Sequence, residues 1–239
     1  MPFHLRPSAP TAADALICGD PARALTIAQH VMVQPRMSNH HRGLWGYHGA
    51  TPSGLELTVQ ATGIGAPSAV AVLAEAAELG IRRIVRIGTC AGVGPVPHSL
   101  GATVVVATAT ARDGASAALG SGPEAIPDGE LTSALAALAG APEASVSSAD
   151  LLPGAGDRPA AGLHDLQTAA VLTLARRLGL AAAAALVVRS LDGRRLEDDP
   201  LEAALLRLAD AGVAALESSG GTGSTPDRPV PKVSTSTRD

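Results

Sequence analysis

The stretch Thr62-Gly63-Ile64-Gly65-Ala66-Pro67-Ser68 joins an apolar segment at 55–60 to a segment of helical periodicity at 67–79. A strand, a glycine-containing turn and a helix in this order are typical of a layered α/β domain. Glycines in such a turn also let backbone N–H groups approach a bound molecule closely. The stretch therefore predicts an α/β fold and, within it, a loop suited to a small oxyanion such as phosphate.

Two other segments repeat this pattern. Val85-Arg86-Ile87-Gly88-Thr89-Cys90 ends an apolar run with an arginine and a hydroxyl separated by two residues. Cys18-Gly19-Asp20-Pro21-Ala22-Arg23 follows a strand and places an arginine at the opening of a helix. Arginine offers an anion a charged fork of donors. Because ligands of open α/β sheets gather at the carboxyl ends of strands, we expect the three loops to form one site.

The other elements are predicted from hydrophobic period and turn residues. Strands are expected at 15–18, 44–47, 55–60, 83–87, 102–107, 144–148 and 182–188. Helices are expected at 21–29, 67–79, 128–138, 163–178 and 200–216. Residues 1–217 then form one domain with a surface loop at 114–127, and 218–239, rich in Gly, Ser, Thr and Pro, a disordered tail.

Composition excludes several classes of function. The chain has 239 residues, of which 46% are hydrophobic and 17% charged, as in a globular domain. Aromatic residues make up only 1% and the net charge is −4, so we expect no nucleic-acid binding. No apolar run reaches the length of a membrane span, the N-terminus lacks a signal sequence, and the two cysteines fit neither a disulfide framework nor a metal site. We therefore expect a cytoplasmic protein with no membrane segment and no metal.

Short motifs spread over residues 3–216 resemble the nucleoside phosphorylase family, and within it the uridine phosphorylases more than the purine enzymes. The motifs are Phe3-His4-Leu5, Gly19-Asp20-Pro21 with Arg23, His41-Arg42, the glycine loop at 62–68, Arg86-Ile87-Gly88-Thr89, Arg112-Asp113-Gly114-Ala115-Ser116 and Ser147-Ser148. The resemblance implies a three-layer α/β/α domain with a central mixed, partly barrel-like β-sheet. It also implies cleavage of a nucleoside by inorganic phosphate, giving free base and ribose or deoxyribose 1-phosphate, with no cofactor beyond phosphate as co-substrate.

Residue roles follow from the resemblance alone. Phosphate is assigned to the Gly19 backbone, Arg23, Arg86 and Thr89, with Arg42 reaching in from a neighbouring subunit. His4 matches the histidine that crosses the dimer interface to the ribose 5′-hydroxyl, and Thr89 is expected to contact the nucleoside as well. A homo-oligomer built from dimers is therefore expected, and family members are commonly hexamers.

The sugar site departs from the family pattern. Family members carry Met-Glu, whose glutamate holds the 2′- and 3′-hydroxyls, where this chain has Leu166-Gln167. Glutamine still accepts a hydrogen bond, but losing a charge-assisted one costs about 1.5–3 kcal/mol. Weaker sugar binding and a different sugar both fit this change. Asp165, two residues earlier on the helix expected at 163–178, is expected to point elsewhere.

The base site departs as well. Pyrimidine-specific relatives use Gln-x-Arg to hold the base, and only the arginine has a match here, Arg158. Arg189, at the end of the strand at 182–188, matches a second base-facing arginine when a short deletion is placed before it. The expected catalytic residues are thus Arg86, Arg158 and Arg189, the last two stabilising the leaving base. Purine enzymes place an aspartate where Ser190 stands, and Asp192 matches it only after a register shift, so a purine reaction is disfavoured.

Three functions remain open at this point. The leading one is a uridine-phosphorylase-like enzyme acting on a pyrimidine or modified nucleoside. The second is a catalytically degenerate paralogue that binds nucleoside or phosphate or joins a hetero-oligomer, which the change at Gln167 favours. The third, a hydrolase using water, is disfavoured because it has little use for a triple-arginine phosphate site.

Overall fold

The computed structural model describes residues 2–155 and 160–219 of the chain. Its helices are α1 (Pro21–Val31), α2 (Gly65–Glu78), α3 (Gly114–Ala118), α4 (Gly129–Ala139), α5 (Thr168–Leu178), α6 (Asp198–Ser218) and the short 3₁₀ turn η1 (His41–Gly43). Its strands are β1 (Asp14–Cys18), β2 (Val33–Asn39), β3 (Gly46–Ala50), β4 (Glu56–Ala61), β5 (Arg83–Val93), β6 (Thr103–Arg112), β7 (Glu124–Ala125), β8 (Glu143–Ala149), β9 (Gly162–Asp165), β10 (Ala181–Leu191) and β11 (Arg194–Arg195).

The strands form one mixed sheet that closes on itself in its middle. They follow the order β11-β10-β6-β8-β9-β5-β1-β4-β3-β2. Because β10 pairs with both β6 and β5, and β9 with both β8 and β5, five strands complete a ring. From β5 the sheet continues as an open, parallel β5-β1-β4 segment and ends in two antiparallel strands. The predicted mixed, partly barrel-like sheet is confirmed.

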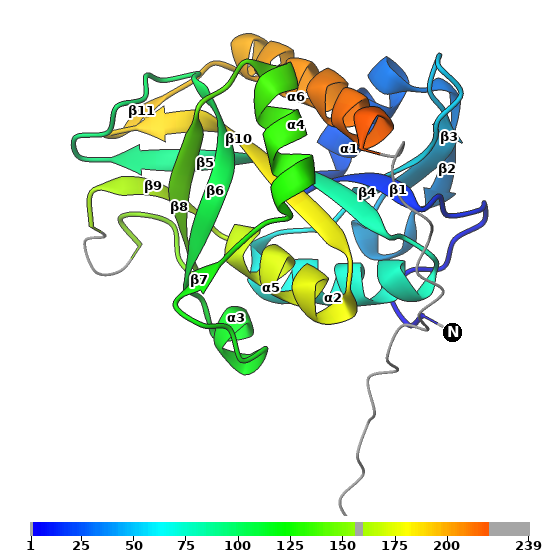
Figure 1. Cartoon of the computed structure of the whole chain (residues 1–239), viewed down its shortest axis with the longest axis horizontal. Helices are drawn as coiled ribbons and strands as arrows, with labels where there is room; N and C mark the ends of the chain where they lie inside the picture. Colours follow the sequence, from blue (N-terminus) through cyan, green and yellow to red (C-terminus); the bar gives the residue numbers. More distant parts are fainter. Residues whose placement is uncertain (1, 156–159, 220–239) are drawn as a thin grey trace, which may run out of the picture.

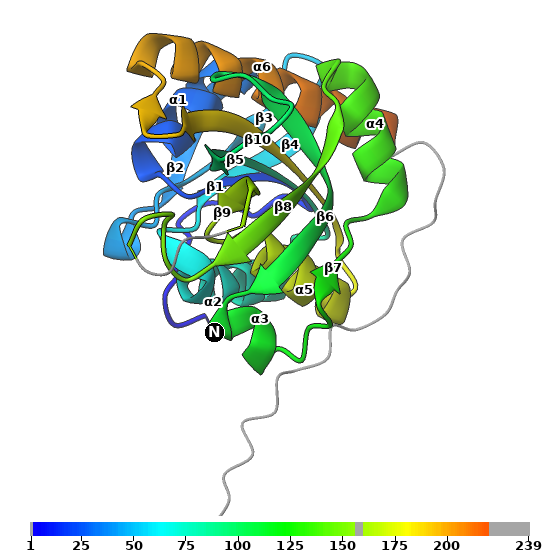
Figure 2. The same cartoon turned by 90° about the vertical axis from the view of Figure 1, so that its left-hand side faces the viewer.

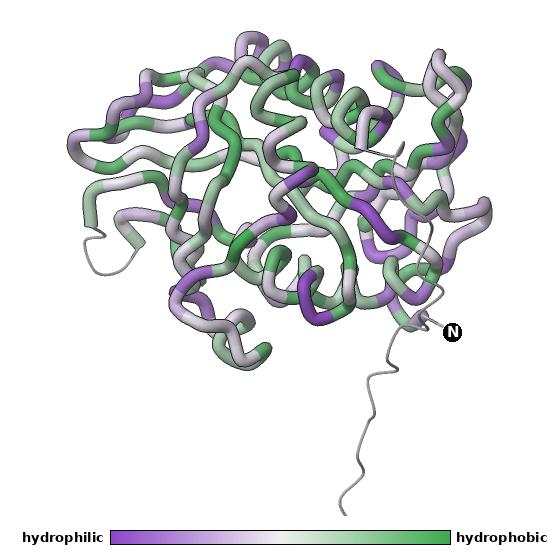
Figure 3. Tube along the Cα trace, in the orientation of Figure 1, coloured by the Kyte–Doolittle hydropathy of each residue, from purple (hydrophilic) through white to green (hydrophobic). Residues whose placement is uncertain are grey.

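Helices cover the sheet on both sides (Figure 1). One apolar core packs side chains of α1, α4 and α6 against the sheet, and a second packs those of α2 and α5. Figure 2 shows the same two layers from the side, with α3 beside α2 and α5. The strands in the middle of Figure 3 are largely apolar, as expected for a sheet buried on both faces. The chain is therefore the three-layer α/β/α domain that was predicted.

Small residues replace aromatic ones in this packing. Alanines fill most buried positions of α2 and of β10. In α6, a Cβ atom added at Gly212 would lie 3.1 Å from Leu16 and 3.2 Å from Val85, so the helix rests directly on β1 and β5. Close approach of backbones buries enough apolar surface even in a chain with so few large side chains.

The structure differs from the sequence expectations in several places, among them β2 (Val33–Asn39), which was not predicted. The helix expected at 163–178 is in fact β9 followed by α5, so residues 162–165 were wrongly predicted as helix. The strand expected at 83–87 continues to Val93, which puts Gly88 and Thr89 inside β5 rather than in a loop. The loop expected at 114–127 contains α3 and β7. The last helix ends at Ser218. Most of the tail expected at 218–239 lies outside the described residues, which end at 219.

None of the helices within the described ranges is both long enough and apolar enough to cross a membrane.

Candidate active site

The first glycine loop links β1 to α1. The carboxylate of Asp20 caps α1 by accepting a hydrogen bond from the Ala22 N–H at 2.9 Å. Ahead of this cap, Gly19 approaches the second glycine loop so closely that a Cβ atom would lie 3.3 Å from the Gly63 carbonyl oxygen. The same atom would lie 3.5 Å from Oε1 of Gln167. A side chain at position 19 would therefore separate segments that the fold brings together.

The second glycine loop is tied to the first through backbone and hydroxyl contacts. The Thr62 N–H donates to the Cys18 carbonyl at 2.7 Å, and the Thr62 hydroxyl oxygen lies 3.1 Å from the same carbonyl oxygen. Ser68, in the first turn of α2, donates back to the Thr62 carbonyl at 2.7 Å. Gly63 and Gly65 have φ of 75° and 80°, a backbone conformation that favours glycine. The predicted turn is thus a connection between β4 and α2 that is held by hydrogen bonds and whose backbone conformation glycine adopts readily.

Arg86 makes three hydrogen bonds at the centre of the site, one from each guanidinium nitrogen. Its Nη2 lies 2.9 Å from Oδ2 of Asp165, its Nη1 3.0 Å from Oε1 of Gln167, and its Nε 3.0 Å from Oγ1 of Thr168. Arg86 is 4% exposed and Asp165 5% exposed. These side chains form what we call the Arg86 network, a buried ion pair held by hydrogen bonds on every nitrogen of the guanidinium group.

Asp165 occupies the end of β9, and from there its carboxylate meets several donors. Ser148 donates to Oδ1 at 2.5 Å, and the hydroxyl of Thr168 donates to Oδ2 at 2.5 Å. The Thr168 N–H lies 3.1 Å from Oδ2, and Ser148 accepts in turn from the Ala169 N–H at 2.9 Å. Asp165 therefore caps α5 while it neutralises Arg86. The expectation that it points away from the site was wrong, because it ends a strand and does not lie on the helix.

Every polar group of the Gln167 side chain has a partner within the chain. Its Oε1 accepts from Arg86 at 3.0 Å and from the Thr62 hydroxyl at 3.3 Å. Its Nε2 donates to the carbonyls of Gly63 at 2.5 Å and Gly65 at 3.2 Å. A primary amide has two acceptor lone pairs and two N–H groups, and all four are used. Gln167 thus joins the start of α5 to the second glycine loop.

Gly88 makes room for the guanidinium group. A Cβ atom at this position would lie 2.9 Å from Nη2 of Arg86 and 2.8 Å from a methyl group of Leu186. Both distances are shorter than real Cβ contacts, so a side chain at this position would require the Arg86 guanidinium group or the Leu186 side chain to move. The role of Gly88 is therefore steric and does not depend on a turn.

A second group of arginines lines a cavity of about 190 Å³ between α1, β10 and α6. Arg23 and Arg189 line its α1 and β10 sides, while Asp198 and Glu202 line the α6 side and Asp20 its rim. Within residues 2–155 and 160–219, neither Arg23 nor Arg189 forms an ion pair. We call this hollow the arginine cavity, and its lining combines two arginines with three carboxylates.

The electrostatics of Arg23 link the arginine cavity to the Arg86 network. Burial lowers the pKa of Arg23, and the positive charges of Arg189 and Arg86 act in the same direction, against Cys18 and Asp20. Arg23 thus stands in a partly desolvated position, where Cys18 and Asp20 affect its pKa more than the two neighbouring arginines do. Burial also raises the pKa of the Cys18 thiol to about 11, so this residue is a neutral wall rather than a nucleophile.

The other predicted site residues are distributed as follows. Thr89 is half-buried in β5, and Leu166 is half-buried between β9 and α5. Arg42 is exposed in η1 with φ of 57°, and His4 lies against α2; neither lines the arginine cavity of its own chain. Arg158 lies outside the described residues. The structure therefore brings Gly19, Arg23, Arg86, Gln167 and Arg189 together, but it does not bring His4 and Arg42 into the same cavity.

Sequence reasoning did not assign these roles to several polar side chains that organise the site, although Ser148 was named in a family motif and Asp165 was considered for the sugar site. Asp165, Ser148 and Thr168 hold the Arg86 network, and Glu75 holds the N-terminal segment. A signal existed for Glu75, since it and Glu78 are the only charged residues in an otherwise apolar α2. Within the described residues, no group of three or more His, Cys, Asp or Glu side chains is arranged to hold a metal ion.

Comparison with known proteins identifies the family. The family model of the Phosphorylase superfamily matches residues 14–155, and the chain belongs to this superfamily. The matched residues include Gly19, Arg23, Arg42, Arg86 and Thr89. Leu166, Gln167 and Arg189 lie beyond the match.

Relatives of both purine and pyrimidine type are similar to parts of the chain. A purine nucleoside phosphorylase of DeoD type from Oceanobacillus iheyensis is 37% identical over 79 residues, 33% of each chain. A uridine phosphorylase from Treponema pallidum is 38% identical over 97 residues, 41% of this chain and 36% of its own. Another DeoD-type enzyme, from Clostridium beijerinckii, is 35% identical over 94 residues, 38% of this chain and 39% of its own. The chain matches only about a third of the length of these relatives.

Proposed function

We propose that this protein cleaves the N-glycosidic bond of a nucleoside with inorganic phosphate, and that a pyrimidine or modified nucleoside is its substrate. The observation that carries the proposal is the pair Arg23 and Arg189, two cations without an ion-pair partner in the described residues, beside the glycine loops. Membership of the Phosphorylase superfamily supports it. The whole reaction runs in either direction, towards base and pentose 1-phosphate or towards nucleoside.

Phosphate occupies the arginine cavity in this proposal. The guanidinium groups of Arg23 and Arg189 bind it, and the backbone N–H of Gly19 donates to it from the end of β1. Thr89 adds a hydroxyl that has no hydrogen-bond partner among the described residues. The charge of Arg86 is already paired with Asp165. Arg86 therefore attracts phosphate from a distance, and it binds phosphate directly only if its hydrogen bonds to Asp165 and Gln167 break.

The sugar and base are held by fewer polar contacts than in the family pattern. Leu166 gives the sugar an apolar contact, and Gln167 contacts its hydroxyls only by giving up one of its four internal hydrogen bonds. Arg158 and Arg189 stabilise negative charge on the departing base. Asp192 is poorly suited to protonate a purine, because its Oδ1 accepts from the Gly94 N–H at 2.9 Å. These contacts favour a pyrimidine leaving group.

A second copy of the chain completes the site. Arg42 is exposed in η1 and His4 is bound to α2, so each is available to a neighbouring subunit and not to its own cavity. A homo-oligomer built on dimers, working in the cytoplasm, fits this arrangement.

One observation favours a second candidate function. The Arg86 network binds three of the five N–H groups of Arg86 and both N–H groups of Gln167 inside the chain. A degenerate paralogue that binds phosphate or nucleoside without turnover, or that joins a hetero-oligomer, requires only such a closed, stable site. Turnover decides between the two functions, because binding alone satisfies both.

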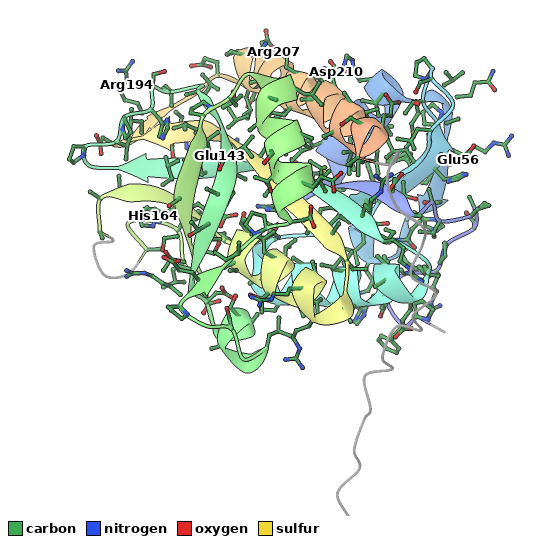
Figure 4. The ribbon with its side chains drawn as sticks, in the orientation of Figure 1. Glu56, Glu143, His164, Arg194, Arg207 and Asp210 are labelled. Carbon is green, nitrogen blue, oxygen red and sulfur yellow. The ribbon has the colours of Figure 1, made fainter. Side chains whose placement is uncertain are left out.

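The test measures release of free base from uridine, deoxyuridine, thymidine, 5-substituted uridines, inosine and adenosine, with and without phosphate. We expect phosphate-dependent release from a pyrimidine nucleoside. Arg23→Ala and Arg189→Ala are each expected to raise the KM for phosphate about 10- to 100-fold, the value of a charge-assisted hydrogen bond. Arg207→Ala removes the same charge from the outer face of α6, where Figure 4 labels it, and is expected to change nothing.

The possible results distinguish a phosphorylase from a hydrolase and from a degenerate paralogue. Base release that needs no phosphate would overturn the phosphorylase in favour of a hydrolase. A folded protein that binds phosphate by calorimetry but releases no base would support the degenerate paralogue. If the Arg23, Arg189 and Arg207 variants have the same KM for phosphate, phosphate does not bind in the arginine cavity.

A further inference from the structure

The arginine cavity carries opposite charges on different walls. Arg23 on α1 and Arg189 on β10 supply the positive charges, and α6 supplies the carboxylates of Asp198 and Glu202. Figure 2 shows the start of α6 beside α1 and the end of β10. None of these four side chains forms an ion pair with another described residue, so the arginine nitrogens and the α6 carboxylate oxygens are more than 4.0 Å apart. The cavity therefore keeps its charges separate instead of pairing them.

The wall formed by α6 combines its two carboxylates with an apolar surface. Asp198 and Glu202 are four residues apart, so they lie on the same face of the helix. Leu201 and Leu205 belong to this face and are 5% and 4% exposed. Ile27 of α1, 1% exposed, lines the cavity beside them. A ligand that enters between α1 and α6 thus meets negative charge next to apolar side chains.

Helix stability accounts for only one of the two carboxylates. Acidic side chains in the first turn of a helix interact favourably with its dipole, and Asp198 and Asp199 both occupy the first turn of α6. Glu202 lies beyond this turn, where the effect of the dipole has fallen off. Like charges four residues apart also repel each other in a helix. A cation bound between Asp198 and Glu202 would remove this repulsion.

Phosphate alone does not match the charges of the cavity. Bound to Arg23 and Arg189, it would face the two carboxylates of α6 across a cavity of about 190 Å³. Asp20, at the rim, adds a third carboxylate, although one of its oxygens caps α1. Negative charges that share a partly desolvated cavity repel each other. A ligand set with an anion at the arginines and a cation at α6 matches both walls.

We propose that the nucleoside carries a positively charged group on its base, and that this group binds between Asp198 and Glu202 while phosphate binds to Arg23 and Arg189. The inference rests on the proposed function. It adds the substrate class, a pyrimidine nucleoside with an ammonium substituent. The substituent is placed on C5, a ring carbon that carries neither a carbonyl nor an N–H group and is not bonded to the nitrogen that holds the sugar.

The experiment compares kcat/KM for 5-aminomethyluridine and 5-hydroxymethyluridine, whose substituents are similar in size but differ in charge. The wild type is expected to prefer the amine about 2- to 25-fold, because each of two exposed ion pairs contributes about 1.5- to 5-fold. Asp198→Asn and Glu202→Gln are each expected to reduce this ratio by one such factor. Asp199→Asn removes the same charge from the first turn of α6 without lining the cavity, so it is the matched control and should leave the ratio unchanged.

A charge reversal tests the α6 wall without a charged nucleoside. Glu202→Lys places an ammonium group of the protein itself on this wall. With uridine as substrate, it is expected to lower the KM for phosphate about 2- to 5-fold and to reverse the preference towards 5-hydroxymethyluridine. Glu202→Gln should give intermediate values, and Asp199→Lys should change neither quantity. An unchanged KM for phosphate in Glu202→Lys would mean that the charge at this position does not reach the ligand, and would overturn the inference.

Binding measurements separate this inference from the proposed function. If the wild type releases base from no nucleoside, the phosphorylase function fails, and calorimetry in the presence of phosphate then decides the inference. 5-Aminomethyluridine is expected to bind more tightly than 5-hydroxymethyluridine, and Glu202→Gln to reduce the difference. Equal affinity for the two nucleosides in the wild type would overturn the inference, as would an equal effect of Glu202→Gln and Asp199→Asn on their ratio.

Discussion

The side-chain amide of Gln167 donates to the carbonyl oxygen of Gly63 at 2.5 Å, across the gap between α5 and the second glycine loop. Positive φ at Gly63 and Gly65 turns two loop carbonyls towards this amide. The family pattern has a glutamate at this position, and a carboxylate has no hydrogen to offer either carbonyl. The glutamine therefore does more than remove a negative charge, because its amide supplies the two donors that these carbonyls accept.

Restoring the family residue in Gln167→Glu is expected to destabilise the protein and to give no gain in uridine cleavage. The new carboxylate keeps the Arg86 contact but faces the carbonyls of Gly63 and Gly65 without a donor. The loss of these two hydrogen bonds is expected to cost about 1–3 kcal/mol in urea unfolding. Gln167→Met, which removes all four hydrogen bonds without adding charge, is the control. A large gain in uridine turnover would mean instead that the wild type has relinquished that substrate.

The sequence contained the layers of this fold but only part of the site. Buried alanine and valine runs and the glycine loops predicted strands at β1, β4, β5, β8 and β10, because a sheet covered on both faces needs continuous apolar strands. The short β9 was missed because residues 162–165 run into α5 without a strong turn signal, so the helical pattern extended over both. This error misplaced Asp165. The Arg86 network depends on contacts between β5, β8, β9 and α5, which are far apart in the sequence. A local sequence pattern cannot predict such contacts.

The buried ion pair between Arg86 and Asp165 yields a second prediction. Their side chains are 5% and 2% exposed, so Arg86→Met leaves an uncompensated carboxylate in the core. The free energy of unfolding is expected to fall by about 3–5 kcal/mol. Adding Asp165→Asn should recover part of the loss, because the unpaired charge is then removed. An Asp165→Asn change that worsens the Arg86→Met variant would contradict this account.

Arg83 offers a matched comparison within the same strand. It pairs with Asp14 at 2.6 Å, but its side chain is 24% exposed and that of Asp14 is 9% exposed. Arg83→Met is therefore expected to cost less than Arg86→Met. A further variant, Arg86→Ala, tests phosphate binding. If this variant remains folded and turns over at the wild-type rate, Arg86 has no part in binding phosphate.

Gly88→Ala is expected to disturb the Arg86 network directly. The added methyl group would lie 2.9 Å from Nη2 of Arg86 and 2.8 Å from a methyl group of Leu186, and both of these side chains are buried. A loss of about 1–3 kcal/mol in stability is expected, together with reduced turnover. Gly129→Ala, with no atom within 4 Å of the added carbon, is the control and should be neutral. Full activity and stability in Gly88→Ala would show that the Arg86 side chain can move aside without cost, contrary to this account.

The two buried thiols predict how stability depends on alkaline pH. Burial raises the pKa of Cys18 to about 11, against a smaller opposing effect of Arg23, and burial raises that of Cys90 to about 12. In the unfolded chain a thiol titrates near pH ~8.5. Between these values the unfolded chain releases thiol protons that the folded chain keeps, so the free energy of unfolding falls as pH rises. The slope is about 1.4 kcal/mol per pH unit for each thiol.

Urea unfolding at pH 8, 9 and 10 measures this slope. Cys18→Ala and Cys90→Ala should each flatten it by one thiol's share, and the double variant by both, because the two residues lie in separate cores. At pH 8 the folded protein should also resist alkylation, since neither thiol ionises there. Rapid alkylation of Cys18 without loss of structure would mean that it is not the neutral, buried wall of the site described above. A slope unchanged by both substitutions would assign the alkaline loss to other groups, such as Tyr47, whose pKa burial also raises.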